Sequence, residues 1–174
     1  PPPASPPASS PASSSAAAAI PILGTPEEAW IGRLDPGGTP WDTRTEFKVG
    51  EHSAFVVEPK TQAVGKPWVW RARFPTYHTE IDELLLADGY HIAHINTGSK
   101  LGSPKALAIW KEFYDLLTTQ YGLNQKMALE GVSRGGLYVY RWAKNYPKTV
   151  ACIYNDTPVC DFKSWPGGKG KGKG

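Results

Sequence analysis

The amino-acid sequence predicts an α/β fold, with a mostly parallel sheet and helices on both of its faces. Two observations predict it. Short runs with strand-like composition alternate with segments of helical periodicity from about residue 45 to residue 155. The chain is also long enough for one domain, at 174 residues, and its hydrophobic content of 40% suits a globular core.

The first predicted elements form an antiparallel hairpin. Residues 45–49 alternate around Phe47 and Val49, and residues 53–57 form a second apolar run. Gly50 and Glu51 between them suit a tight turn. After a polar loop, residues 67–74 ("PWVWRARF") are expected to form a third strand.

A helix is expected over residues 80–87, followed by a fourth strand. Thr79 is positioned to cap the helix, with Asp82 as a weaker capping-box partner. Gly89 suits the position that ends a helix. Residues 90–96 ("YHIAHIN") have the composition of a buried strand.

The second helix has the clearest start in the chain. Ser103 supplies a capping hydroxyl, and Pro104 fits the first helical turn. Apolar side chains then recur with helical spacing to about residue 119, and Gly122 follows the end.

The last elements are a strand, a helix and a strand. Residues 127–129 form the core of a fifth strand, and residues 137–145 ("LYVYRWAKN") are apolar on nearly all sides, which predicts a buried helix. Pro147 ends that helix, and residues 150–155 form a sixth strand.

The chain divides by composition into three parts. Residues 1–26 are rich in Pro, Ala and Ser and are expected to be a disordered linker. Residues 27–161 form the predicted domain. Residues 162–174, rich in Gly and Lys, are expected to be a flexible segment, which is also where a cap could start.

Composition argues against several classes of protein. A net charge of +3 is too small an imbalance to favour nucleic-acid binding. No apolar run is long enough to span a bilayer. The two cysteines, Cys152 and Cys160, match no zinc or redox motif, so we expect no metal and no cofactor. The Pro-, Ala- and Ser-rich linker favours an exported or tethered protein, and the sequence leaves the oligomeric state open.

The sequence "MALEGVSRGG" carries the chemistry. Gly131, Gly135 and Gly136 surround Ser133 at the end of the fifth strand and the start of a helix. Small residues let a strand reverse sharply into a helix and present the serine hydroxyl. The amide of Arg134 would then point to where an oxyanion forms. An ordinary turn serine is the competing interpretation.

These residues, the hairpin before them and the order of elements resemble the α/β-hydrolase fold. The resemblance covers roughly residues 45–161, with the C-terminal strands of the fold missing. The "SRGG" elbow and the upstream "WRARF" are similar to bacterial hydrolases grouped near esterases and the prolyl-oligopeptidase catalytic domain. The resemblance implies a serine hydrolase that acts on a small-molecule or carbohydrate ester, or on an amide, with Ser133 as nucleophile.

The same resemblance implies a second oxyanion amide in the loop after the third strand. The residues expected to supply it are Phe74, Thr76 and Tyr77. The general base should be a histidine that follows the serine in the chain. All four histidines, at positions 52, 78, 91 and 94, precede it.

Three explanations are open for the missing histidine. The chain could be truncated, in which case this segment alone is expected to be inactive. A triad could use His78 or His94. The domain could also be a non-catalytic binding or structural relative that keeps the fold. Asp156 is a candidate for the acid, against the simpler interpretation of a turn former, and a prolyl-oligopeptidase-like peptidase is a further alternative.

Two arginines share the third strand with Trp70. Arg71 and Arg73 could each reach the crevice and bind a carboxylate, although a solvated strand end is the default interpretation. The tryptophans of this strand and of the two later helices are expected in the core.

Overall fold

The computed structural model describes residues 44–161, 163 and 165–167. The predicted linker at 1–26 and most of the 162–174 segment therefore lie outside the described residues. Within them the chain forms one six-stranded sheet of order β1-β2-β4-β3-β5-β6. In this described sheet β1 pairs antiparallel with β2, and β2 pairs antiparallel with β4, whereas the remaining neighbours run parallel.

The hairpin consists of β1 (Arg44–Val49) and β2 (His52–Val57), which pair in full register. Gly50 makes the turn with a φ of 58°, a conformation that glycine adopts at little cost. β4 (His91–Ile95) then lies between β2 and β3 (Trp68–Arg71), so the chain crosses over and the sheet becomes parallel.

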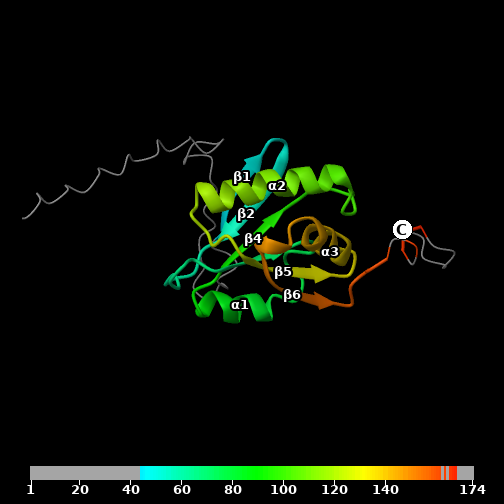
Figure 1. Cartoon of the computed structure of the whole chain (residues 1–174). Helices are drawn as coiled ribbons and strands as arrows, with labels where there is room; N and C mark the ends of the chain where they lie inside the picture. The colour runs from blue at the N-terminus through cyan, green and yellow to red at the C-terminus, as the bar shows by residue number, and fades with distance from the viewer. Residues whose placement is uncertain (1–43, 162, 164, 168–174) are drawn as a thin grey trace, which may run out of the picture.

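The helices lie on both faces of the sheet, as predicted. α1 (Glu80–Ala87) covers one face, and α2 (Pro104–Thr119) and α3 (Gly135–Asn145) cover the other (Figure 1). β5 (Met127–Val132) leads into α3, and a short 3₁₀ turn, Pro147–Thr149, leads into β6 (Val150–Asp156). These boundaries differ from the predicted ones by only a few residues.

The larger core lies under α2 and α3 and is built on tryptophan. The Trp70 ring stacks on Trp110 with ring centroids 4.1 Å apart and meets Trp142 edge-on at 5.0 Å. All three side chains are buried, as the sequence predicts. A smaller core under α1 joins Leu86 to Val69 and to neighbouring aliphatic residues of β2 and β4. Together the two cores fix the sheet that carries the site.

Three local predictions were wrong in detail. α3 is not buried all round, because Tyr140 is 41% exposed and only the side with Tyr138, Val139 and Trp142 faces the core. Thr79 does not cap α1 by a backbone hydrogen bond, since its hydroxyl donates to the Glu83 carboxylate instead. β3 ends at Arg71, three residues early.

β6 is the edge of the sheet within the described residues. Its apolar side chains Ile153 and Tyr154 are 38% and 47% exposed. Cys152 on the same strand and Cys160 beyond it are both exposed and free thiols. None of the helices described here combines the length and the apolar content that a membrane-spanning segment requires.

Candidate active site

Ser133 lies on a sharp turn between β5 and α3. Its φ is 50°, a region that costs a non-glycine residue about 1–3 kcal/mol and that persists only where neighbouring bonds enforce it. Those bonds are present: Ser133 N–H donates to Asp156 O at 3.0 Å, and Ser133 O accepts from Val159 N at 2.7 Å and Gly136 N at 3.1 Å. The backbone of β6 and of the segment after it therefore hold the serine in this conformation.

The glycines around Ser133 are not equivalent. A β-carbon on Gly131 would collide with the side-chain oxygen of Asn155, and one on Gly136 would lie 2.7 Å from Val159 O. A β-carbon on Gly135 would meet only ordinary contacts, at 3.5 Å from Ala72 and Arg73. Close packing therefore requires Gly131 and Gly136, whereas Gly135, which completes the five-residue pattern, has room for a methyl group.

The amide of Arg134 is free at the start of α3, within the described residues. Arg134 is the N-cap residue of α3, and its N–H makes no hydrogen bond to any residue that the structure describes. It stands at the positive end of the α3 dipole. The virtual β-carbon of Gly135 lies 3.6 Å from Arg73 N, so the end of β3 passes directly beside this turn.

The loop after β3 offers further amides. The N–H groups of Arg73, Phe74 and Thr76 donate no hydrogen bond within the described part of the chain. Tyr77 N–H is already bound to Phe74 O at 3.1 Å, so it is occupied in this conformation. Phe74 has a φ of 51°, which turns the chain away from the strand direction. Arg73, which sequence reasoning did not name, is therefore a candidate beside Phe74 and Thr76.

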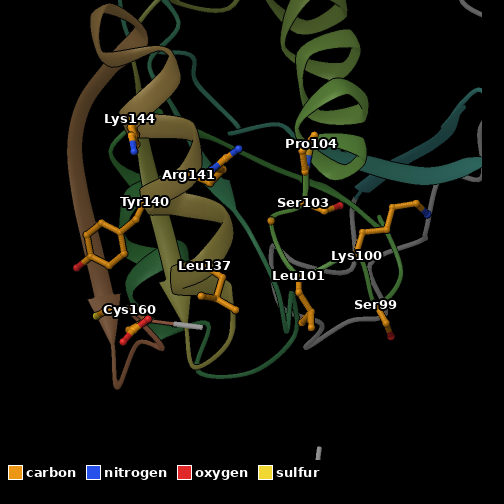
Figure 2. A pocket seen from close by; sticks show the side chains of 12 residues that line it. Ser99, Lys100, Leu101, Ser103, Pro104, Leu137, Tyr140, Arg141, Lys144 and Cys160 are labelled. Atoms are coloured by element: carbon orange, nitrogen blue, oxygen red, sulfur yellow. The ribbon is translucent and has the colours of Figure 1, made fainter. Parts of the chain in front are cut away.

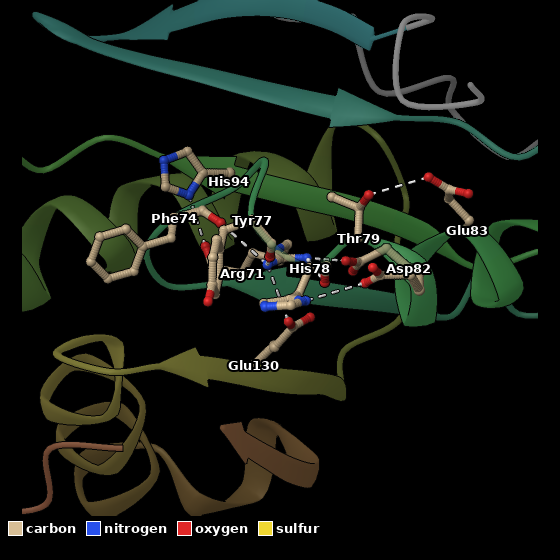
Figure 3. A network of polar contacts seen from close by, with 10 residues as sticks. Arg71, Phe74, Tyr77, His78, Thr79, Asp82, Glu83, His94 and Glu130 are labelled. Carbon is tan, nitrogen blue, oxygen red and sulfur yellow. Dashed lines mark hydrogen bonds and ion pairs between the residues drawn. The ribbon is translucent and has the colours of Figure 1, made fainter. Parts of the chain in front are cut away.

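Arg71 organises this loop from inside the protein, as Figure 3 shows. Its guanidinium is fully buried and donates to the carbonyls of Phe74 at 3.2 Å and Tyr77 at 2.5 Å. It also forms ion pairs with Asp82 of α1 and, at 3.4 Å, with Glu130 of β5. The default interpretation of Arg71 as a solvated strand end was wrong, because three elements close around its side chain.

The two acids beside Arg71 differ in how they ionise. Burial is the main cause that raises the pKa of Glu130 to about 8, and the charge of Asp82 adds to it. Burial also raises the pKa of Asp82, against the opposing effect of Arg71. One guanidinium cannot neutralise two buried carboxylates, so Glu130 is the group that keeps its proton at neutral pH.

The histidines do not form a triad with Ser133. His94 pairs in register with Arg71 of β3, which pairs in turn with Glu130 of β5. His94 therefore lies two strand spacings, about 10 Å, from Glu130, and Ser133 is three residues further along the chain. Its Nδ1 donates to Arg71 O at 2.9 Å, and burial lowers its pKa to about 4, so the ring is neutral. His78 is exposed and lies 3.7 Å from the Glu80 carboxylate.

Asp156, the candidate acid, is the last residue of β6 and pairs in register with Val132. It is half-buried, and its charge contributes to the raised pKa of Glu130. Its carboxylate makes no hydrogen bond to a serine or a histidine among the described residues. Its structural link to the nucleophile is through the backbone, and its role as the acid stays a prediction.

A shallow pocket of about 610 Å³ lies on the outer side of α3 (Figure 2). It is lined by the loop that precedes α2, by residues of α3 that include Arg141 and Lys144, and by Cys160 and Asp161. Ser133 is not among the lining residues. No group of three or more metal-ligating side chains occurs in the part of the chain that the structure describes.

Comparison with solved structures places this sheet and turn among known folds. An esterase from an Arctic intertidal metagenomic library is similar with a TM-score of 0.53 and 13% identity, over 65% of this chain and 57% of its own. An acetyl xylan esterase from Aspergillus awamori has a TM-score of 0.52 and 14% sequence identity, and the match covers 64% of this chain and 50% of that esterase. An esterase from Pyrococcus furiosus has a TM-score of 0.51 and 17% sequence identity, and the match covers 72% of this chain and 56% of that esterase.

The chain has the α/β-hydrolase fold. No family model and no curated protein matches the sequence, so the likeness rests on structure, and at these identities it concerns the fold alone. The chain spans about half the length of the solved chains it resembles. Ser133 lies on the turn that follows the fifth strand of this sheet.

Proposed function

We propose that Ser133 is the nucleophile of a serine hydrolase that cleaves carboxylic esters through an acyl-enzyme. The observation that carries the proposal is the elbow itself. A non-glycine residue with φ of 50° is fixed at the carboxyl end of β5, next to an Arg134 amide without a partner among the described residues. Backbone strain of this kind at a helix N-terminus is typical of an activated serine.

The chemistry divides into two steps. Ser133 Oγ attacks the ester carbonyl, its proton passes to a general base, and the carbonyl oxygen takes up negative charge beside Arg134 N–H. The tetrahedral species collapses, the alcohol leaves with a proton, and an acyl-serine remains. Water then attacks the acyl-serine, releases the acid and restores the hydroxyl. The base is proposed to be a histidine outside residues 1–174, because no described histidine is placed to serve.

The structural likeness to esterases supports an ester, rather than an amide, as the substrate proposed for this protein. Three solved structures with TM-scores above 0.5 are described as esterases, one of them as an acetyl xylan esterase. A carbohydrate ester is therefore included among the substrates to be tested. The absence of a suitable base among the described residues favours one competing function, a non-catalytic binding domain that keeps the fold.

Active-site labelling distinguishes these two functions. The longest natural polypeptide that contains this chain would be incubated with an uncharged fluorophosphonate probe. We expect covalent labelling that is lost in Ser133→Ala and retained in Ser99→Ala, a serine in the loop before α2. Labelling that survives Ser133→Ala would reject the nucleophile, and no labelling of a correctly folded protein would favour the binding domain.

A further inference from the structure

Two arginines flank the candidate nucleophile and converge on one aromatic ring. The guanidinium of Arg134 lies 5.3 Å from the centre of the Phe74 ring, and that of Arg73 lies 5.8 Å from it. Arg134 follows Ser133 directly, and Arg73 begins the loop that passes beside the elbow. Both cations are therefore placed at the carboxyl edge of the sheet, within reach of a substrate bound to Ser133.

Neither cation is neutralised within the part of the chain that the structure describes. No described carboxylate forms an ion pair with Arg73 or Arg134. Arg71, two residues before Arg73, has two acidic partners by contrast. The Nε atoms of Arg73 and Arg134 are buried and have no acceptor. Arg73 satisfies one terminal nitrogen through Gly98 O at 2.9 Å. The remaining terminal nitrogens of the two guanidiniums, unlike the buried Nε atoms, are left for a ligand.

A purely structural role does not account for this arrangement. An aromatic ring attracts one cation through its face, but two cations on one ring repel each other. The positive potential at this edge also affects His94. Burial is the main cause that lowers the pKa of His94, and the charges of Arg73 and Arg71 lower it further. Two neighbouring guanidiniums that form no ion pair with a described carboxylate favour the binding of an anion.

We infer that the ester cleaved at Ser133 carries a carboxylate, which Arg73 and Arg134 bind while Phe74 holds their guanidiniums in place. This inference rests on the proposed function and narrows its substrate class to monoesters of dicarboxylic acids or esters of carboxylated alcohols. Because both side chains start from residues whose amides border the expected oxyanion, the carboxylate lies a few bonds from the scissile carbonyl. The planar, forked guanidinium suits such a group better than an ammonium does.

The test compares matched esters on the longest natural polypeptide that contains this chain. The 4-nitrophenyl monoester of adipic acid is compared with 4-nitrophenyl hexanoate, and 3-acetoxybenzoate is compared with its methyl ester. In at least one pair we expect kcat/KM for the anionic ester to exceed that for the neutral one by roughly tenfold or more. Ser133→Ala supplies the background of uncatalysed hydrolysis.

Arginine variants then assign the preference. In the double variant Arg73→Gln/Arg134→Gln the ratio should fall to about one, while Arg73→Lys/Arg134→Lys should keep part of it. Arg44→Gln is the matched control, because Arg44 also lies over a phenylalanine ring, that of Phe55, but on the far edge strand β1. Its ratio should equal that of the wild type.

Three outcomes overturn the inference. They are equal or lower kcat/KM for both anionic esters, a preference that survives the double glutamine variant, and a preference abolished equally by Arg44→Gln. A second readout does not need turnover: adipate should slow fluorophosphonate labelling of Ser133 in the wild type but not in the double variant. Labelling of Ser133 without any anionic preference would reject the substrate class and leave the hydrolase intact, whereas absent labelling would reject both.

Discussion

The side chain of Asn155 covers the α-carbon of Gly131, so that a β-carbon at position 131 would collide with the amide oxygen. Asn155 and Gly131 are register partners on β6 and β5. β5 is therefore packed tightly against β6 two residues before Ser133. On the other side of the turn, Gly136 is pressed against the backbone of Val159.

The first prediction follows from the unequal space at these glycines. Gly131→Ala should destabilise the protein by about 1–3 kcal/mol, because Asn155 must move. Gly136→Ala should cost at least as much, because the obstructing atom, Val159 O, belongs to the backbone. Gly135→Ala should be neutral or stabilising by up to about 1 kcal/mol, since alanine favours the helix and its methyl group fits. Chemical denaturation of the three variants measures the free energies of unfolding.

The comparison depends on the order of the three variants in their free energies of unfolding. If Gly135→Ala destabilised the protein as strongly as Gly136→Ala, the close approach of β6 to the elbow would not be the reason for the glycines. Equal m-values across the three variants would show that the changes act on the folded state rather than on the compactness of the unfolded chain.

Periodicity and turn residues were enough to predict every α-helix and strand that the structure describes, but not the 3₁₀ helix at Pro147–Thr149. The hairpin, the helices and the elbow are local patterns, and each could be located within a few residues. The same patterns also placed the tryptophans in the core. The prediction that α3 is buried on all sides was wrong because the α2-facing side has enough apolar residues for packing, and Tyr140 and Arg141 are left exposed.

The cluster around Arg71 could not be predicted, because its members come from distant parts of the chain. Asp82 lies on α1 and Glu130 on β5, and only the crossover that places β3 between β4 and β5 brings them together. One signal was present: Arg71 and Val69 point to the same face of a strand otherwise filled by tryptophan. A charged residue at such a position is buried only with acidic partners.

The second prediction concerns the start of α2, where sequence and structure agree. Ser103 Oγ accepts a hydrogen bond from Ala106 N at 3.3 Å. Ser103→Ala should therefore destabilise the protein by about 1 kcal/mol. Thr79→Ala, at the start of α1, should cost less, because Thr79 makes no capping bond to the backbone. Urea denaturation of both variants tests this, and a larger loss for Thr79→Ala would contradict the difference in capping.

The third prediction is a pH dependence caused by His94. Its pKa is about 4 in the folded state and 6.5 in an exposed chain, so the unfolded state binds the proton first as the pH falls. The stability contributed by the neutral ring is present above pH 6.5 and is lost as the pH approaches 4. The loss attributable to this group is on the order of 3 kcal/mol.

His94→Asn is the matching variant, because its amide can donate to Arg71 O as Nδ1 does but has no titration in this range. The free energies of unfolding of wild type and variant would be measured between pH 7 and pH 4. We expect the wild type to lose more stability than the variant over this interval. Parallel curves would mean that His94 is protonated equally in both states.

The last prediction concerns Glu130 and runs in the opposite direction. Its pKa is raised to about 8 from an ordinary value of 4.5, so between these values the folded state holds a proton that the unfolded state has released. The stability that this group contributes is fully present below pH 4.5 and is lost as the pH rises through 8.

Glu130→Gln imitates the protonated acid, and it should flatten the loss of thermal stability between pH 6 and pH 9. Glu112→Gln, an exposed acid of α2, is the control that should follow the wild type. If Glu130→Gln destabilised the protein more at pH 9 than at pH 6, the carboxylate rather than the acid would be the form that Arg71 stabilises, and the assignment of the shared proton to Glu130 would be wrong.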